Sequence, residues 1–386
     1  MRYSIFAILP IIFVLGCAGS LHLPEGTTVS DEDIPWSTTR GDCAQWAFGY
    51  CKSNGEPEIL WKANLKTPIL APPAAGDGAI FVGTPTKRVF AFDALTGERI
   101  GKLWVNVPVE DGLSYSDGLL AITGRSIYNS LQLYDLDKNS SVWNKKSDRA
   151  AAAPIICGET IYYATAKGAI FAMNLSGNKL WRTALTDATI KHEPAFRDSL
   201  LFIADSNKKL YCLAADSGKI MWKITLPSAP VGPPIVLPDH VIIPTSSGRI
   251  PIARLDGNIR LIIEGSGELN TPIACAGPTI YGVTRFGVVF AGDIGEGGLY
   301  WETNLDEPVI VPPTIWGTEL VVITASNRLA LLDLADGRIV HEIDIGEPVS
   351  AAPIVYISNL YIGTETGELI AVGRKSETQE IQNDRQ

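Results

Sequence analysis

The chain has 386 residues, of which 46% are hydrophobic and 19% are charged, and this composition excludes a largely disordered protein. The formal net charge is −10, and an acidic surface repels phosphate backbones, so we expect no nucleic-acid partner. Length alone would suggest two or three domains, but a single closed β fold can be this large.

The first sixteen residues have the features of a secretory signal. Arg2 precedes an apolar run from Ile5 to Leu15, which is too short to span a bilayer as a helix. The run leads into Leu15-Gly16-Cys17, which resembles a bacterial lipobox. That resemblance implies a lipoprotein signal peptide over residues 1–16 and lipidation of Cys17, which would hold the protein on a membrane. An ordinary signal peptide with a chance cysteine is the alternative.

Residues 17–56 are predicted to form the lipidated N-terminus and a tether. Within them Cys43 and Cys51 lie close together in GDCAQWAFGYC, and an oxidising compartment favours a local disulfide between them over a metal site. The remaining cysteines, Cys157, Cys212 and Cys275, lie in apolar strand patterns and are predicted to be small buried side chains.

A proline recurs before a β-branched apolar run through most of the chain, at Pro73, Pro154, Pro194, Pro234, Pro272, Pro313 and Pro353. The steps between these prolines are 81, 40, 40, 38, 41 and 40 residues, so the first step contains one unit without the marker. Each unit has four short alternating runs separated by turn residues, the pattern of a hairpin sheet. Four strands every 40 residues indicate propeller blades, and we predict an all-β, eight-bladed β-propeller over residues 57–373.

The last unit has only three strands before the chain turns polar at Arg374, and residues 374–386 are predicted to be a disordered tail. The missing strand is EILWKANL at residues 58–65, which we expect to complete the last blade and close the ring. Its Trp61 is matched with the tryptophans of other units, and Ile262 and His341 are placed there in the fifth and seventh units. The matched tryptophans are Trp104, Trp143, Trp181, Trp222 and Trp301. One such residue per blade predicts packing between blades rather than a cofactor site.

The unit at residues 353–371, with a Gly-Lys-x-x-Trp stretch such as residues 218–222, resembles the pyrroloquinoline-quinone (PQQ)-like propeller repeat. Trp36, Arg40, Gly41 and Asp42 also resemble a stretch that precedes many such propellers. A lipobox followed by one eight-bladed ring is similar to the layout of the BamB-like subunits of the outer-membrane β-barrel assembly machinery. The resemblance implies a non-enzymatic scaffold on the periplasmic face of the outer membrane. Its expected partners are the barrel-inserting subunit or other envelope proteins, with the chain a monomer within the complex.

Two alternatives to the scaffold are a generic periplasmic lipoprotein of the PQQ-like repeat class and, more distantly, a quinoprotein dehydrogenase. The inner strands read mostly small and apolar, which offers little to the three carboxylates of PQQ, and no Cys-Cys dipeptide occurs. We therefore predict no catalytic residues, no cofactor and no metal. One unit departs from this lining with Lys191, His192 and Glu193, a candidate binding spot at the channel mouth whose alternative is a solvated strand end.

Overall fold

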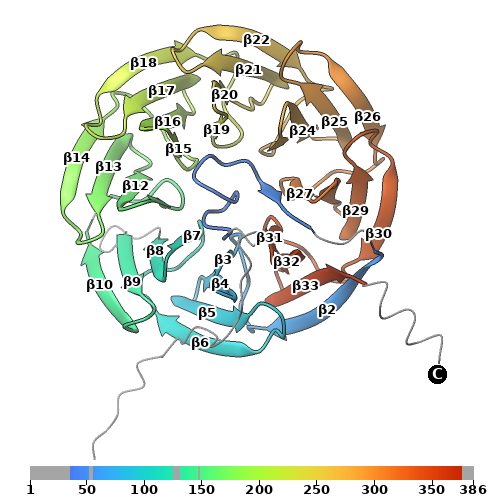
Figure 1. Cartoon of the computed structure of the whole chain (residues 1–386), viewed down its shortest axis with the longest axis horizontal. Helices are drawn as coiled ribbons and strands as arrows, with labels where there is room; N and C mark the ends of the chain where they lie inside the picture. Colours follow the sequence, from blue (N-terminus) through green and yellow to red (C-terminus); the bar gives the residue numbers. More distant parts are fainter. Residues whose placement is uncertain (1–34, 52–54, 125–130, 147, 376–386) are drawn as a thin grey trace, which may run out of the picture.

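The computed structural model describes residues 35–51, 55–124, 131–146 and 148–375, and every regular element within them is a β-strand. These strands form eight sheets arranged as the blades of a closed ring (Figure 1). The predicted all-β, eight-bladed propeller is thus confirmed.

In blades 1 to 7 the chain starts at the hub and runs outward through antiparallel neighbours, so that the last strand lies at the rim. Blades 1 to 4 comprise β3 (Ala74–Gly76), β4 (Ala79–Thr84), β5 (Arg88–Asp93) and β6 (Arg99–Trp104); β7 (Leu113–Ser116), β8 (Leu119–Thr123), β9 (Leu131–Asp135) and β10 (Ser140–Lys145); β11 (Ile155–Cys157), β12 (Thr160–Ala164), β13 (Ala169–Asn174) and β14 (Lys179–Ala184); β15 (Ala195–Arg197), β16 (Leu200–Asp205), β17 (Lys209–Ala214) and β18 (Ile220–Thr225). Blades 5 to 7 comprise β19 (Ile235–Val236), β20 (His240–Ile242), β21 (Arg249–Arg254) and β22 (Ile259–Glu264); β23 (Ala274–Ala276), β24 (Thr279–Val283), β25 (Val288–Asp293) and β26 (Leu299–Asn304); β27 (Thr314–Trp316), β28 (Glu319–Ile323), β29 (Arg328–Asp333) and β30 (Ile339–Asp344). Blade 8 comprises β31 (Ile354–Tyr356), β32 (Asn359–Gly363), β33 (Glu368–Arg374) and, from the N-terminal side, β2 (Pro57–Asn64).

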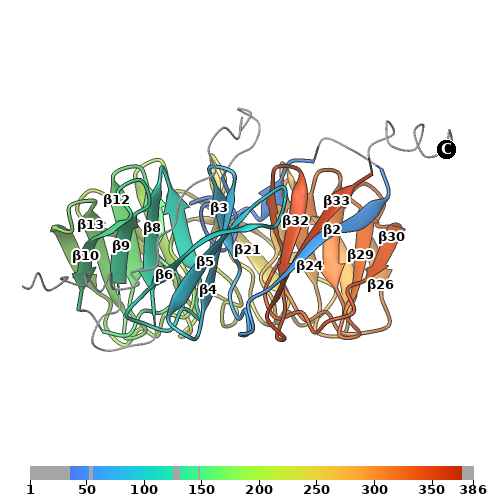
Figure 2. The same cartoon turned by 90° about the horizontal axis from the view of Figure 1, so that it is seen from below.

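Blade 8 closes the ring as the sequence predicts. β2 pairs antiparallel with β33, and Trp61 lies opposite Ala371 (Figure 2). The Trp61 ring packs at 5.8 Å from the ring of Tyr361. The propeller ends at Arg374, one residue later than the predicted end at residue 373. Arg374 belongs to β33, and its side chain is only 3% exposed. The guanidinium lies 4.1 Å above the Trp316 ring and pairs with Glu319 of blade 7.

The tryptophans of the rim strands join neighbouring blades. In five blades the indole N–H of the rim-strand tryptophan donates to a backbone carbonyl of the next blade, for example Trp181 to Ala215 at 2.8 Å. The ring also lies against a turn glycine of that blade, since a Cβ built on Gly218 would be 2.4 Å from Trp181. Equivalent bonds are made by Trp61, Trp143, Trp222 and Trp301. The predicted role in packing between blades is therefore confirmed for these five.

Two residues were matched to this position wrongly. In blade 1 Gly101, not Trp104, pairs at the equivalent register position, and Trp104 lies at the strand end with 54% of its surface exposed. In blade 5 the position belongs to Leu261 rather than Ile262. Both errors have one cause: the match followed residue type rather than the distance from the turn glycine. Gly101 and Leu261 lie four residues after Gly97 and Gly257, as Trp181 lies four residues after Gly177.

Replacing Gly97 by alanine is expected to weaken ring closure specifically. Gly97 has φ +71° and a Cβ would lie 2.5 Å from Trp61. Gly158 has φ +59° with nothing within 4 Å of an added Cβ, so Gly158→Ala is a matched control for backbone strain alone. We expect Gly97→Ala to lower the free energy of unfolding by about 1–3 kcal/mol more than Gly158→Ala, measured by urea denaturation. Equal losses would show that the contact with Trp61 does not contribute.

Candidate functional site

The hub of the ring is filled by the chain's own N-terminal part. Residues 35–51, which we call the hub segment, cross the centre of the ring in Figure 1 and end beside blade 7, where β1 (Phe48–Gly49) pairs in parallel with β27. Trp36, Gln45 and Ala47 are at most 3% exposed. The prediction of a tether is therefore wrong for these residues. Eight inner strands leave unpaired edges around a channel, and packing the hub segment there satisfies six of them.

The hub segment bonds to the blades in ring order. In six blades the middle amide of the innermost strand donates to a hub-segment carbonyl at 2.8–3.0 Å. The donor and acceptor pairs are Ala75 to Trp36, Tyr115 to Ser37, Phe196 to Cys43, Val236 to Ala44, Cys275 to Trp46 and Ile315 to Ala47. In blade 3 the equivalent amide, that of Ile156, donates to the Ser114 hydroxyl at 3.2 Å. The segment thus acts as an internal cap on the ring's inner edges.

A disulfide fixes the hub segment to blade 3, and it is not the predicted one. Cys43 bonds to Cys157 across 114 residues of sequence, with the Cα atoms 6.4 Å apart. Cys51 lies beside blade 8 instead, where its thiol donates to the Ser358 carbonyl at 3.7 Å. The predicted disulfide between Cys43 and Cys51 was wrong, because the hub segment runs around the hub and places these two residues beside different blades. Cys212 and Cys275 are fully buried, and burial raises the pKa of each thiol to about 12.

Arg40 and Glu193 are buried charged side chains at the middle of the hub segment, 4% and 8% exposed. The Arg40 side chain reaches the blade 6 and blade 7 side of the hub, where its Nη2 and Nη1 donate to the carbonyls of Ile273 at 2.5 Å and Pro313 at 3.3 Å. Burial lowers the pKa of Arg40 to about 10, and the charge of Glu193 acts in the opposite direction. Glu193 accepts a 2.6 Å hydrogen bond from the Thr39 hydroxyl, and burial raises the pKa of its carboxyl.

The three residues predicted at the channel mouth therefore differ in their surroundings. Lys191 is exposed, and His192 is half-buried with Nε2 at 3.3 Å from the Pro230 carbonyl. Glu193 is 8% exposed and is engaged with the hub segment. Ligand binding by this trio stays a prediction, and the geometry gives Glu193 a structural role that the sequence pattern did not indicate.

His192 is expected to make stability fall in weak acid. Burial lowers its pKa from 6.5 to about 4, so the unfolded chain binds the proton more readily in this interval. Stability from this group is complete above pH 6.5 and is lost as the pH falls toward 4, by at most about 3 kcal/mol. Glu193, with its raised pKa, acts in the opposite direction. The difference between the wild type and His192→Gln in denaturation curves from pH 7 to 4 isolates the histidine, and parallel curves would contradict the prediction.

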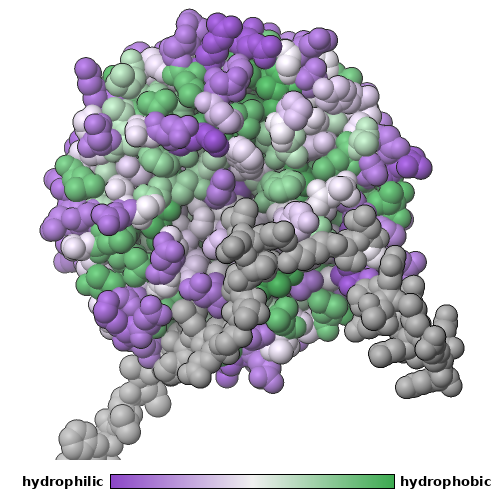
Figure 3. All heavy atoms as spheres, in the orientation of Figure 1, coloured by the Kyte–Doolittle hydropathy of each residue, from purple (hydrophilic) through white to green (hydrophobic). Residues whose placement is uncertain are grey.

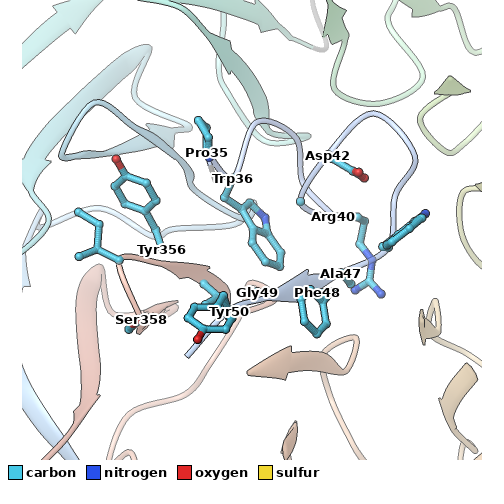
Figure 4. A pocket seen from close by; sticks show the side chains of 14 residues that line it. Pro35, Trp36, Arg40, Asp42, Ala47, Phe48, Gly49, Tyr50, Tyr356 and Ser358 are labelled. Atoms are coloured by element: carbon cyan, nitrogen blue, oxygen red, sulfur yellow. The ribbon is translucent and has the colours of Figure 1, made fainter. Parts of the chain in front are cut away.

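A cavity of about 250 Å³ lies between the hub segment and blade 8 (Figure 4). Its walls are mainly aromatic and aliphatic, and they include Trp36, Phe48, Tyr50 and Tyr356. Among the described residues there is no group of three or more histidine, cysteine or acidic side chains placed to hold a metal ion. Over the same residues, no helix has the length and hydropathy needed to cross a membrane.

Solved structures with this fold include proteins of different functions. BamB from Moraxella catarrhalis aligns with a TM-score of 0.71 at 17% identity, covering 83% of this chain and 98% of that one. The quinohemoprotein alcohol dehydrogenase ADHIIG from Pseudomonas putida HK5 aligns with a TM-score of 0.72 at 13% identity, covering 90% of this chain and 81% of that one. The fold is that of an eight-bladed β-propeller, which BamB and the quinohemoprotein alcohol dehydrogenase share.

Sequence comparison gives the family. The model described as outer membrane protein assembly factor BamB matches residues 51–175, 172–260 and 253–380, and the chain belongs to this family. A protein of that name from Burkholderia pseudomallei is 24% identical over 253 residues, 60% of this chain and 65% of its own length. Another from Moranella endobia is 21% identical over 210 residues, 47% of this chain and 54% of its own. The chain thus spans just under two thirds of the first relative and about half of the second.

Proposed function

We propose that this protein is a non-enzymatic envelope scaffold that assists assembly and insertion of outer-membrane β-barrel proteins by docking on the barrel-inserting subunit. Membership of the BamB family supports this function, because relatives in it carry the assembly-factor name. The single structural observation that carries the proposal is the hub, which holds residues of the chain itself where a dehydrogenase of this fold class would need room for its quinone.

The hub residues do not fit PQQ. A tricarboxylate needs cationic and amide donors. Six of the inner-strand amides that face the hub already donate to the hub segment. Arg40 is the buried cation of the hub segment, and both of its Nη atoms donate to carbonyls. Cofactor binding would require the whole segment to leave, so a scaffold is favoured over a quinoprotein dehydrogenase.

The rim strands are poorly suited to pairing with a partner strand. All eight of them carry a β-bulge, in which two residues lie opposite one residue of the neighbouring strand. Bulges interrupt the ladder and discourage edge-to-edge pairing. We therefore place partner docking on the loop faces of the ring. On the face shown in Figure 3, apolar side chains are dispersed among polar ones rather than gathered in one patch.

We also propose that Cys17 carries the lipid anchor. This residue lies outside the part of the chain that the structure describes. Several acyl chains on one cysteine would hold the protein firmly, since each buried CH₂ contributes about 0.8 kcal/mol. We expect Cys17→Ser to move the protein from the membrane fraction to the soluble periplasmic fraction, as measured by fractionation and immunoblotting. A variant that stays in the outer-membrane fraction would contradict lipid anchoring.

Affinity purification from detergent-solubilised membranes tests the function. The wild-type protein should co-purify with the barrel-inserting subunit. Deletion of the gene for the present protein should reduce the amount of folded outer-membrane barrels. Recovery of other envelope proteins without this subunit would favour the alternative of a generic PQQ-like repeat lipoprotein. Stoichiometric binding of PQQ with Ca²⁺, together with dye-linked alcohol oxidation, would overturn the scaffold.

A further inference from the structure

The hub segment leaves the inner edge of one blade uncapped. In blades 1 to 7 the middle amide of the innermost strand has an acceptor, and in six of them the acceptor is a peptide carbonyl. Val355 is the equivalent residue of blade 8, since it faces Leu360 as Ala75 faces Ile80 in blade 1. Within the described part of the chain, no acceptor is found for the Val355 amide. Val355 lines the cavity beside the hub segment.

Two more unpartnered donors line the same cavity. The indole N–H of Trp36 and the Nε–H of Arg40 are buried and have no acceptor among the described residues, and the two side chains are 3% and 4% exposed. Other polar groups of the wall are engaged: the Asp42 carboxylate accepts from the Ala44 amide, and the Tyr356 hydroxyl accepts from the Gly78 amide. These donors therefore have no acceptor among the described residues, and buried donors without acceptors are unfavourable.

We propose that this cavity binds an extended peptide segment, which presents a backbone carbonyl to Val355 and an aromatic or branched aliphatic side chain to the apolar wall. In the six capped blades these amides donate to a peptide carbonyl. The aromatic rings of Phe48 and Tyr50 lie at the exposed side of the cavity, 41% and 48% exposed (Figure 4). They give an incoming side chain apolar surface to cover.

The charges around the cavity favour a neutral peptide over a free anion. Arg40 already donates from both Nη atoms to carbonyls, and the carboxylate of Glu193 offsets its charge. A carboxylate ligand would thus meet little uncompensated positive charge. A strand segment of an outer-membrane barrel protein that has not yet folded has the required chemistry. Only this identification of the peptide's source rests on the proposed function.

The test uses the purified protein and a blocked pentapeptide, acetyl-Val-Thr-Phe-Thr-Val-amide, in isothermal titration calorimetry. We expect saturable binding of one peptide per chain, and about tenfold weaker binding of the peptide with alanine in place of phenylalanine. Phe48→Ala and Tyr50→Ala should each weaken binding of the parent peptide by about tenfold. Both side chains are well exposed, so these variants should fold. Phe286→Ala, at a phenylalanine that is 72% exposed and does not line the cavity, is the matched control and should bind like the wild type.

Three results would overturn the proposal. The first is the absence of saturable binding, or an equal loss in Phe286→Ala. The second is binding of phenylacetate without binding of the peptide, which would make the site one for small anions. The third is peptide binding only after residues 18–34 are deleted, which would assign the cavity to the chain's own N-terminal part. Peptide binding without recovery of the barrel-inserting subunit would contradict the proposed function alone.

Discussion

Replacing Cys43 by serine is expected to lower the free energy of unfolding by about 2–5 kcal/mol. The disulfide to Cys157 closes a loop of 114 residues, and long loops gain the most from a cross-link in the chain-entropy description. Cys157→Ser should cause the same loss, and a reductant should bring the wild type to the level of the two variants. Guanidinium denaturation with and without reductant measures all three.

Cys51 provides the control for this experiment. Cys51→Ala should retain most of the stability and should remain sensitive to reductant, because Cys51 forms no disulfide in the structure. Peptide mapping of the oxidised protein should recover the fragment that joins Cys43 to Cys157. A fragment joining Cys43 to Cys51, with Cys51→Ala as unstable as Cys43→Ser, would instead restore the pairing predicted from the sequence.

Removal of the Arg40 charge is expected to have a comparable effect. Arg40→Met deletes two hydrogen bonds to blades 6 and 7 and leaves Glu193 buried without its nearby cation. Each hydrogen bond from a charged group contributes about 1.5–3 kcal/mol, so denaturation should show a loss of about 3–5 kcal/mol. The double variant Arg40→Met/Glu193→Gln should recover part of it, because the uncompensated carboxylate is gone.

An exposed ion pair supplies the comparison for Arg40. Arg338 pairs with Asp336 at 2.6 Å, and the two side chains are 75% and 47% exposed. Arg338→Met should change stability by less than about 1 kcal/mol. If Arg40→Met were equally mild, the hub segment would not be held by its buried charge, and the double variant would show no recovery.

The blades were predictable because their signals are periodic. Proline spacing, alternating runs and a glycine after each third strand recur in unit after unit, and each reflects a local requirement of a hairpin sheet. Closure of the ring through Trp61 was predictable for the same reason. The last repeat lacks its fourth strand, and a matching strand precedes the first repeat. Register at the rim was mispredicted in two blades, because the match followed tryptophan rather than the distance from the turn glycine. Gly101 and Leu261 lie four residues after Gly97 and Gly257.

The hub was not predictable from the residues that fill it. Its main contacts are made by the backbone carbonyls of Trp36, Cys43 and Trp46, which every residue type possesses. Sequence proximity also misled the disulfide assignment, since Cys43 is close to Cys51 in the chain but reaches Cys157 in space. The one usable signal was the isolated arginine in WSTTRGD, next to a segment otherwise poor in cations. Side-chain patterns thus predicted the blades of the propeller. The hub could not be predicted in this way, because it is held by main-chain hydrogen bonds.

The pairing of β2 with β33 also fixes an order of events during biogenesis. β2 finds its partner only after Glu368 to Arg374 have been made, so a strand from near the start of the domain is among the last to be placed. Until then the inner amides and both blade 8 edges stay open, and such long-range closure is slow and exposed to misassociation. A newly made chain would therefore depend on chaperones longest at its two ends, and least in the blades between them.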